Sequence, residues 1–364
     1  MIRFTNQDWD RVKKSFDDWW DKKSECAIIG AKIKRFAPDV KTPTKPLICQ
    51  QNVHLNFTAD EVLDSIEYHL SQYEFIGDTF PRFNMDCFGP GVVAAFLGCK
   101  MDNNNGETGI WFHPEKKLDI NTFNPVYDGD NPVFKRIREI FKKASDRFAG
   151  KILLSMPDLG GVADVLSSFF PGEELLYEMY DNPNQVVASI NKLDDLWQRF
   201  YNDFANDLSC ETYGYTDWSG IYSSKKSYVI QSDITYMLSN DMFKQFVEDS
   251  VKKHASNLER TIFHLDGVGE LKNLDDLLAI PKLTAIQWVP GANSGKDTFF
   301  EWIDVYRKII KADKLVQILL GDFEDIENIV RNVDKKGYVL KKAAVYEESQ
   351  RDYVIRFIDK IKSL

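Results

Sequence analysis

The sequence predicts an α/β fold, a (β/α)8 TIM barrel with an N-terminal α/β extension. From about residue 150 onward, short apolar runs alternate with amphipathic helical segments, which is the order expected of parallel strands joined by crossover helices. The competing fold, a dinucleotide-binding sheet, would carry GxGxxG after its first strand, and that spacing occurs nowhere in the chain. The barrel is therefore the preferred architecture.

The predicted strands are short apolar runs, and several of them end in a polar residue. They are residues 152–156, 228–230, 261–264, 284–288, 315–320 and 338–340. Predicted helices fill the intervals at 173–206, 240–258, 273–279, 297–311, 323–332 and 347–362. Upstream of them we expect a helix at 59–72, a loop at 80–91 and a strand at 109–112. Because the catalytic groups of a barrel sit where strands end and loops begin, the polar residues that close these runs are the natural site candidates.

The N-terminal part is predicted to be an extension of the barrel. Residues 1–125 would form helical extension and cap elements and residues 126–364 the barrel, as one continuous structural unit, with the boundary in the turn-rich stretch 121–132. A helix at 7–24 carries an aromatic stripe: Trp9, Val12, Phe16, Trp19 and Trp20. Such a stripe indicates a helix that covers the core or one that joins two copies of the chain, so a homodimer is one expectation.

Composition argues against several classes of protein. Lys and Arg number 46 against 56 Asp and Glu, a net charge of −10 that would repel a nucleic-acid backbone. The chain has no long uninterrupted apolar window and does not start like a signal peptide, so no membrane association is expected. Its five cysteines include no CxxC pair, which argues against a disulfide framework and a cysteine zinc cluster and fits a cytoplasmic location.

The sharpest pattern is the strand 261–264, which runs into His264 and Asp266 two positions apart. Strand alternation points both side chains to one face. A pair of this kind can be a metal half-site, an imidazole oriented by a carboxylate for proton transfer, or a ligand-binding pair. A strand-end histidine capped by a turn aspartate would give the same pattern, so the residues alone do not decide among these.

Two further strand ends supply candidates. Gln287 and Trp288 close the next strand, where Trp288 offers a flat apolar wall with one donor or plugs the end of the barrel. Asp158 follows the strand at 152–156, and Asp233 opens the segment before the helix at 240. Either carboxylate can serve as an acid, a base or an anchor, and either can be a turn or cap residue.

Three loop segments carry side chains that could contact a substrate. An aromatic, Gly-rich segment supplies Trp218 and suits a loop over a flat or apolar ligand, although a packed loop would have the same composition. Two possible lids from the N-terminal part supply Met85 and Trp111. Cys87 has no basic neighbour in sequence, so we do not expect it to be a nucleophile.

The chain contains no P-loop, HExxH or GxSxG motif, so phosphoryl transfer, zinc-protease and α/β-hydrolase chemistry are unsupported. Five other motifs occur in a characteristic order: PDLGG at 157–161, the helical stretch 173–206, SDITYMLSNDMF at 232–243, FHLDG at 263–267 and IQWVPG at 286–291. In these motifs the chain resembles the uroporphyrinogen decarboxylase-like superfamily over roughly residues 80–360. The resemblance implies a barrel with a deep cleft at the strand ends. It also implies one of two chemistries, porphyrinogen decarboxylation or methyl transfer that involves a corrinoid protein.

The sequence departs from both chemistries. The decarboxylases of the superfamily resemble one another in an Arg-rich N-terminal segment, whereas this chain has only Lys32, Lys34 and Arg35 there. The methyltransferases resemble one another in a zinc site with His-x-Cys and a later Cys. Here His264 matches, Asp266 stands where the first Cys would be, and no cysteine follows residue 210. A zinc site of His264 and Asp266 therefore remains open, and so does a metal-free site for a methyl donor or a corrinoid.

The leading expectation is methyl transfer from a small methylated compound, with a corrinoid protein as partner. His264 and Asp266 would polarise the compound or hold a metal, Asp158 or Asp233 would anchor it, and Trp218 and Trp288 would suit a methyl-bearing group. One alternative is a decarboxylase or lyase in which His264 and Asp233 manage protons without a metal. Another is a ligand-binding barrel without turnover.

Overall fold

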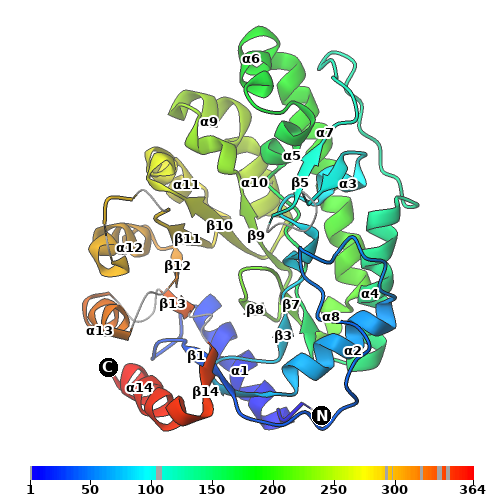
Figure 1. Cartoon of the computed structure of the whole chain (residues 1–364). Coiled ribbons are helices and arrows are strands. Elements are labelled where there is room, and N and C mark those ends of the chain that lie inside the picture. Colours follow the sequence, from blue (N-terminus) through cyan, green and yellow to red (C-terminus); the bar gives the residue numbers. More distant parts are fainter. Residues whose placement is uncertain are drawn as a thin grey trace.

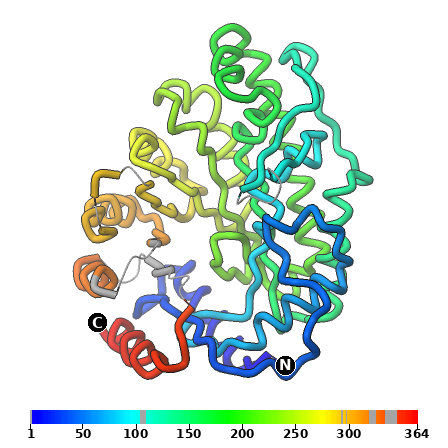
Figure 2. The backbone as a smooth tube through the Cα atoms, in the orientation of Figure 1, coloured from blue at the N-terminus to red at the C-terminus, as the bar shows by residue number. Residues whose placement is uncertain are grey.

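The computed structural model describes residues 2–103, 109–291, 294–296, 298–319, 323–333, 338–341 and 345–364. It is a mixed α/β structure in which helices surround a parallel sheet (Figure 1). The backbone runs around the molecule in sequence order, from cyan through green and yellow to orange (Figure 2). No helix within the described ranges combines the length and the apolar composition that a membrane span requires.

Five parallel strands form the main sheet, in the order β13-β12-β11-β10-β9. They are β9 (Ser227–Gln231), β10 (Arg260–Asp266), β11 (Ala285–Val289), β12 (Leu315–Leu319) and β13 (Tyr338–Lys341). Helices lie between successive strands and after the last one. They are α9 (Asn240–Phe246), α10 (Glu248–Asn257), α11 (Leu274–Ala279), α12 (Ile303–Lys311), α13 (Phe323–Asn332) and α14 (Arg351–Ser363), with 3-10 turns η2 (Asp233–Tyr236), η3 (Val268–Asn273), η4 (Phe299–Trp302) and η6 (Glu348–Gln350). The strands predicted from residue 228 onward are therefore confirmed.

Three short strands precede this sheet in the chain. They are β3 (Arg82–Phe83), β6 (Leu153–Leu154) and β7 (Tyr215–Thr216). β3 pairs in parallel with β6, and Met156 forms a parallel bridge with Asp217, beside β7. The segment predicted as a loop at 80–91 thus contains a strand. No ladder among the described residues joins β13 to β3, so the pairing itself does not close a barrel.

The connections between these strands are mostly helical. They contain η1 (Asp86–Phe88), α3 (Val93–Phe96), α4 (Pro132–Phe148), α5 (Val162–Phe169), α6 (Glu174–Asp181), α7 (Pro183–Asp207) and α8 (Cys210–Tyr213), together with the strands β4 (Lys100–Asp102), β5 (Trp111–His113) and β8 (Tyr222–Ser223). β4 pairs with β5 and β7 pairs with β8, both antiparallel. The predicted helix at 173–206 is divided into α6 and α7 at Asn182, immediately before Pro183, because the residue before a proline disfavours helical geometry.

The N-terminal extension contains α1 (Asn6–Trp20), α2 (Ala59–Leu70), β1 (Gly30–Lys34) and β2 (Tyr73–Gly77). β1 pairs with β2 and also with β14 (Val345–Glu347), so the two ends of the chain share one sheet. A single hydrophobic cluster includes Val62, Phe88 and Phe134, residues on both sides of position 125. The extension and the remainder therefore share one core.

Helix α1 covers the end of the main sheet at which the strands begin. Its aromatic face packs in one cluster with residues in or just before six strands: Phe80, Leu153, Val229, Ile262, Ala285 and Leu315. Trp19 is fully buried there, and Trp20 Nε1 donates to Tyr222 O at 2.9 Å. The predicted aromatic stripe thus covers the core of its own chain, so it offers no surface for joining a second copy.

Candidate active site

A layer of polar side chains lies next to the apolar cluster under α1. Residues two positions apart on a strand share a face, so the residues that follow the cluster members by two also point inward. These are Arg82, Ser155, Gln231, His264, Gln287 and Gln317. Buried polar groups in the middle of apolar strands cost free energy unless they are hydrogen-bonded, so a complete layer of them is typical of a ligand site.

Hydrogen bonds fix the orientation of His264 in this layer. Its Nδ1 lies 2.5 Å from Gln287 Oε1, Gln287 Nε2 donates to Gln317 Oε1 at 2.6 Å, and Gln317 Nε2 donates to Ser219 O at 3.0 Å. Because Gln287 uses its amide nitrogen toward Gln317, its oxygen accepts from His264 Nδ1–H. The basic nitrogen of the neutral ring is then Nε2, which lies 3.8 Å from Asp266 Oδ2.

Above this layer, a cavity of about 270 Å³ opens at the carboxyl ends of β9, β10 and β11. Its lining is Asp233, Tyr236, Asp266, Gly267, Val268, Pro290 and Gly291. The structure therefore brings two of the predicted catalytic residues, Asp233 and Asp266, to one cavity. His264 lies beside them, and its ring meets the Trp218 ring edge-on, with centroids 5.0 Å apart.

Two further acids, the half-buried Asp164 and the fully buried Glu270, hold the backbone at Asp233 and Asp266 in place. Asp164 on α5 accepts from the backbone N–H groups of Asp233 and Ile234 at 3.0 and 2.8 Å. Glu270 in η3 accepts from the backbone N–H of Asp266 at 3.0 Å. Each of the two candidate acids is thus positioned by a second acid, Asp164 or Glu270, that was not among the predicted site residues.

This clustering favours protonated carboxyls. Burial, and then the charge of Asp233, raises the pKa of Asp164, while burial and the charge of Asp266 raise the pKa of Asp233. Burial raises the pKa of Glu270 to about 9. Asp233 is exposed at the cavity and Glu270 is fully buried, so the neighbouring acids favour protonated carboxyls most strongly on the buried side of the cluster.

Asp158 has mainly a turn role. Its Oδ1 accepts from Gly160 N at 2.7 Å, and its carbonyl oxygen accepts from the N–H groups of Gly91 and Val92. Gly160 has φ +81°, and a Cβ there would lie 2.6 Å from the Cα of Gly91, so the two loops pack backbone to backbone. Burial and the charge of Asp233 raise the pKa of Asp158 to about 8, which places it near the same acid cluster.

None of the five predicted substrate contacts lines this cavity: Gln287 and Trp218 contact His264, whereas Trp288, Met85 and Trp111 lie elsewhere. Trp288 is fully buried and packs against Trp302, with ring centroids 5.2 Å apart, because Gln287 takes the inward position and alternation turns Trp288 outward. Met85 is fully buried in the core. Trp111 lies exposed on β5 and is not part of the cavity lining. The structure therefore gives no support to a substrate contact by these three side chains.

The sequence predicted a possible zinc ion at His264 and Asp266, and the side chains around this pair do not support it. Zinc sites in proteins generally have three or four protein ligands. In the described part of the chain, no group of three or more His, Cys, Asp or Glu side chains is arranged to hold a metal ion. The residues therefore do not fit a zinc centre of the usual kind.

Cys87 is buried, which raises the pKa of its thiol and agrees with the expectation that it is no nucleophile.

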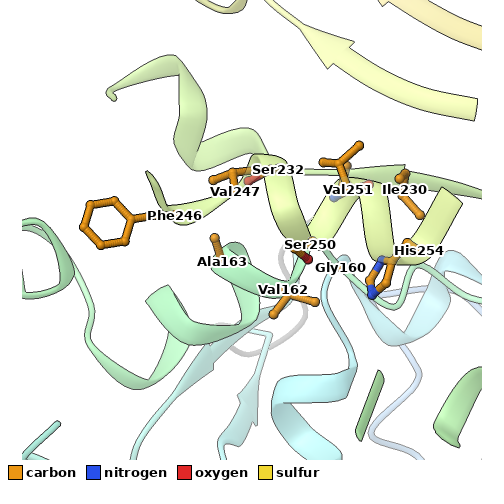
Figure 3. A pocket seen from close by; sticks show the side chains of 12 residues that line it. Gly160, Val162, Ala163, Ile230, Ser232, Phe246, Val247, Ser250, Val251 and His254 are labelled. Atoms are coloured by element: carbon orange, nitrogen blue, oxygen red, sulfur yellow. The ribbon is translucent and has the colours of Figure 1, made fainter. Parts of the chain in front are cut away.

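A second histidine, His254, lines a separate small cavity (Figure 3) and forms a pair with Asp194. His254 on α10 lies 3.0 Å from Asp194 and stacks on Trp197, whose Nε1 donates to Gly160 O at 3.0 Å. The cavity volume of about 10 Å³ is room for a single water molecule. This pair supports the packing of α10 and α7 and has no space for a substrate.

Glu270→Gln is expected to flatten the pH dependence of stability. Folded Glu270 keeps its proton up to a pKa of about 9, whereas the unfolded carboxyl releases it near its ordinary value. The unfolded state therefore binds fewer protons, and the free energy of unfolding falls between about pH 5 and pH 8 by at most about 1.4 kcal/mol per pH unit for one carboxyl. Guanidinium unfolding across this range should show a smaller decline for Glu270→Gln than for wild type. The exposed control Glu25→Gln should match wild type, and equal declines in all three proteins would contradict the assignment.

Comparison with known proteins bears on the fold through solved structures. No protein-family model matches the chain, and no curated protein matches it. Among solved structures, a methyltransferase from Methanosarcina mazei is similar over 97% of this chain and 98% of that chain, with a TM-score of 0.59 and 11% sequence identity. At this identity the likeness shows the fold alone, and it extends over nearly the whole length of both chains.

Proposed function

We propose that this chain is a methyltransferase on a (β/α)8 barrel, and that it takes a methyl group from a small methylated compound in the cavity at Asp233 and Asp266. The observation that carries the proposal is the position of that cavity. It opens above the His264 layer, at the carboxyl ends of the strands, in a chain that shares its fold with a methyltransferase. Active sites of barrels occur at this end of the strands.

The strand order supports the barrel. The strands β3, β6, β7 and β9 to β13 number eight; β4, β5 and β8 lie between them in sequence, and every described ladder that joins two of the eight is parallel. Six of these strands or their leading residues send side chains into the cluster beneath α1. Inward side chains that meet in layers, with a helix across the amino-terminal end, are typical of a closed barrel.

The acid cluster supplies what demethylation requires. When the bond between the methyl carbon and its oxygen, nitrogen or sulfur breaks, that atom keeps the electron pair and must be protonated to leave as a stable product. Asp233 lines the cavity and holds a proton more firmly than an ordinary aspartate. It is placed to give that proton to the leaving atom, and His264 Nε2 can take up a proton from solvent and return it to the cluster.

A corrinoid on a partner protein, when bound, would supply the nucleophile that accepts the methyl group. The chain offers a surface for such a partner at the cavity rim. Tyr236 lines the cavity and is half-exposed, and its neighbour Met237 is 62% exposed. Large apolar side chains exposed beside an open cavity are typical of a protein-binding surface.

The proposal is tested by mixing the purified chain with cob(I)alamin and a panel of methylated amines, thiols, ethers and their carboxylated analogues. The absorbance spectrum of the cobalamin reports formation of methylcob(III)alamin. We expect methyl transfer from at least one donor, and a rate for Asp233→Asn that is lower by about 100-fold. No transfer from any donor, by protein whose circular dichroism shows it folded, would overturn the proposal.

The raised pKa values also favour a second candidate, a decarboxylase or lyase without a corrinoid. A protonated carboxyl beside an oriented imidazole can protonate the carbon from which carbon dioxide leaves. Carbon dioxide release from a carboxylated member of the same panel, in the absence of cobalamin, would favour this reaction over methyl transfer.

A further inference from the structure

Arg82 is a cation in the polar layer whose charge is not paired at close range. It lies half-buried on β3, and its Nη1 donates to Ser155 Oγ at 2.6 Å and to Asp217 O at 2.9 Å. Both acceptors are uncharged. Within the described ranges, no carboxylate lies within 4.0 Å of its guanidinium, although Asp86 and Asp217 act on it from farther away.

The carboxylate of Asp217 is engaged elsewhere. Its Oδ1 accepts from Ser219 N at 2.8 Å and its Oδ2 accepts from Val229 N at 2.9 Å, so it serves to hold the backbone between β7 and β9. The surrounding protein desolvates Arg82, which lowers the pKa of its guanidinium. A desolvated cation without a close counter-ion costs several kcal/mol, so this arrangement is typical of a group kept for a charged ligand.

The remaining hydrogen-bond donors of Arg82 lie on one edge of its guanidinium group. Both hydrogens of Nη1 are accounted for by Ser155 and Asp217, which leaves the Nε–H and Nη2–H groups without a hydrogen bond among the described residues. This edge presents two parallel donors, the geometry that matches the two oxygens of a carboxylate.

The charges around the site are arranged asymmetrically. Arg82 lies on β3 and contacts β6 and the end of β7, whereas the acids Asp233 and Asp266 follow β9 and end β10. Although Asp86 and Asp217 offset part of its charge, Arg82 attracts a ligand carboxylate, whereas Asp233 and Asp266 repel one. The field therefore fixes how an asymmetric ligand lies, with its anionic end at Arg82 and its other end toward His264.

We infer that the methylated substrate is a small carboxylic acid, whose carboxylate binds the Nε–Nη2 edge of Arg82 while its methyl-bearing group faces Asp233 and His264. This inference rests on the proposed function for one point: that the group facing Asp233 and His264 carries a methyl group. The binding of a carboxylate is inferred from the geometry of Arg82 and does not depend on the proposed function. The inference predicts that the carboxylated methyl donors of the panel react best.

The test uses acetate as the carboxylate probe, acetamide as its uncharged counterpart and chloride as the control for ionic strength. The ¹H–¹⁵N signal of the Arg82 Nε–H group, identified by its absence from Arg82→Gln, reports binding. We expect a saturable shift of this signal with acetate in wild type and no saturable shift with acetamide or chloride. Absence of a saturable shift, or an equal shift with chloride, would overturn the inference.

Matched variants make the test independent of any one substitution. Calorimetric titration with acetate should give an affinity lower by about tenfold or more in Arg82→Gln, since a charge-assisted bidentate contact is lost. Arg82→Lys, which keeps the charge and loses the fork, should be intermediate and also serves if Arg82→Gln does not fold. Arg356→Gln, an exposed change of equal charge on α14, should bind as wild type does. Equal affinities in all four proteins would overturn the inference.

Failure of this inference and failure of the proposed function are distinguishable. Acetate binding is measured without cobalamin or turnover, so it can hold even if no methyl group is transferred. Conversely, if methyl transfer occurs but carboxylated donors react no better than their amides, and Arg82→Gln turns over both equally, the proposed function stands and the carboxylate assignment falls.

Discussion

Replacing His264 by alanine is expected to lower kcat/KM for the methyl donor by at least about 100-fold while the protein remains folded. The ring presents Nε2 toward Asp266, and the chain through Gln287 and Gln317 holds it in that orientation. Removal of the ring therefore removes both a proton carrier and the side chain that Trp218 packs against. The measurement is methylcob(III)alamin formation with the donor that the panel identifies.

His113→Ala is the matched control for that experiment, because His113 is an exposed histidine on β5. We expect it to react at the wild-type rate. If His264→Ala also retains the wild-type rate, the polar layer is not the site of chemistry, whatever reaction the protein catalyses.

Replacing Trp19 by alanine is expected to lower the free energy of unfolding by about 3–5 kcal/mol. Trp19 is fully buried, packs against Trp20 with ring centroids 4.6 Å apart, and belongs to the cluster that receives side chains from six strand segments. Its loss opens a cavity where the strands converge. Guanidinium unfolding measures the effect, with Asp10→Ala on the exposed side of α1 as the control.

The same experiment tests whether the aromatic face of α1 packs within its own chain or against a second copy. Since Trp19 packs within its own chain, its effect on stability should not depend on protein concentration. An unchanged free energy of unfolding, combined with a shift from dimer to monomer, would contradict the packing described here.

The strands from β9 to β13 could be predicted because each is an apolar run of about five residues between helical segments. The pair His264 and Asp266 could be found for the same reason, since both close such a run. By contrast, β3 has only Arg82 and Phe83 and lies among prolines and glycines, so local sequence indicated a loop. Its strand character depends on pairing with β6, about 70 residues away.

Strand alternation separates the inward from the outward side chains at the end of β11. Gln287 and Trp288 are adjacent on a strand, so only one of them can face the interior, and the structure places Gln287 there. The same argument selects Gln231 and Gln317, polar residues within apolar runs. No comparable signal marks Asp164, which looks like an ordinary acid in the first turn of α5 and meets the segment of Asp233 only through the fold.

In the proposed reaction, the cavity above His264 receives a methyl donor, and the methyl group leaves that donor for cobalt. The most direct measurement is carbon NMR of donors labelled with ¹³C in the methyl group, incubated with wild-type protein and cob(I)alamin. We predict that the label appears on cobalt, and that it does so more slowly with Asp233→Asn and His264→Ala. A label that stays on the donor while a carboxylated ligand loses carbon dioxide would contradict methyl transfer and identify the site as a decarboxylase.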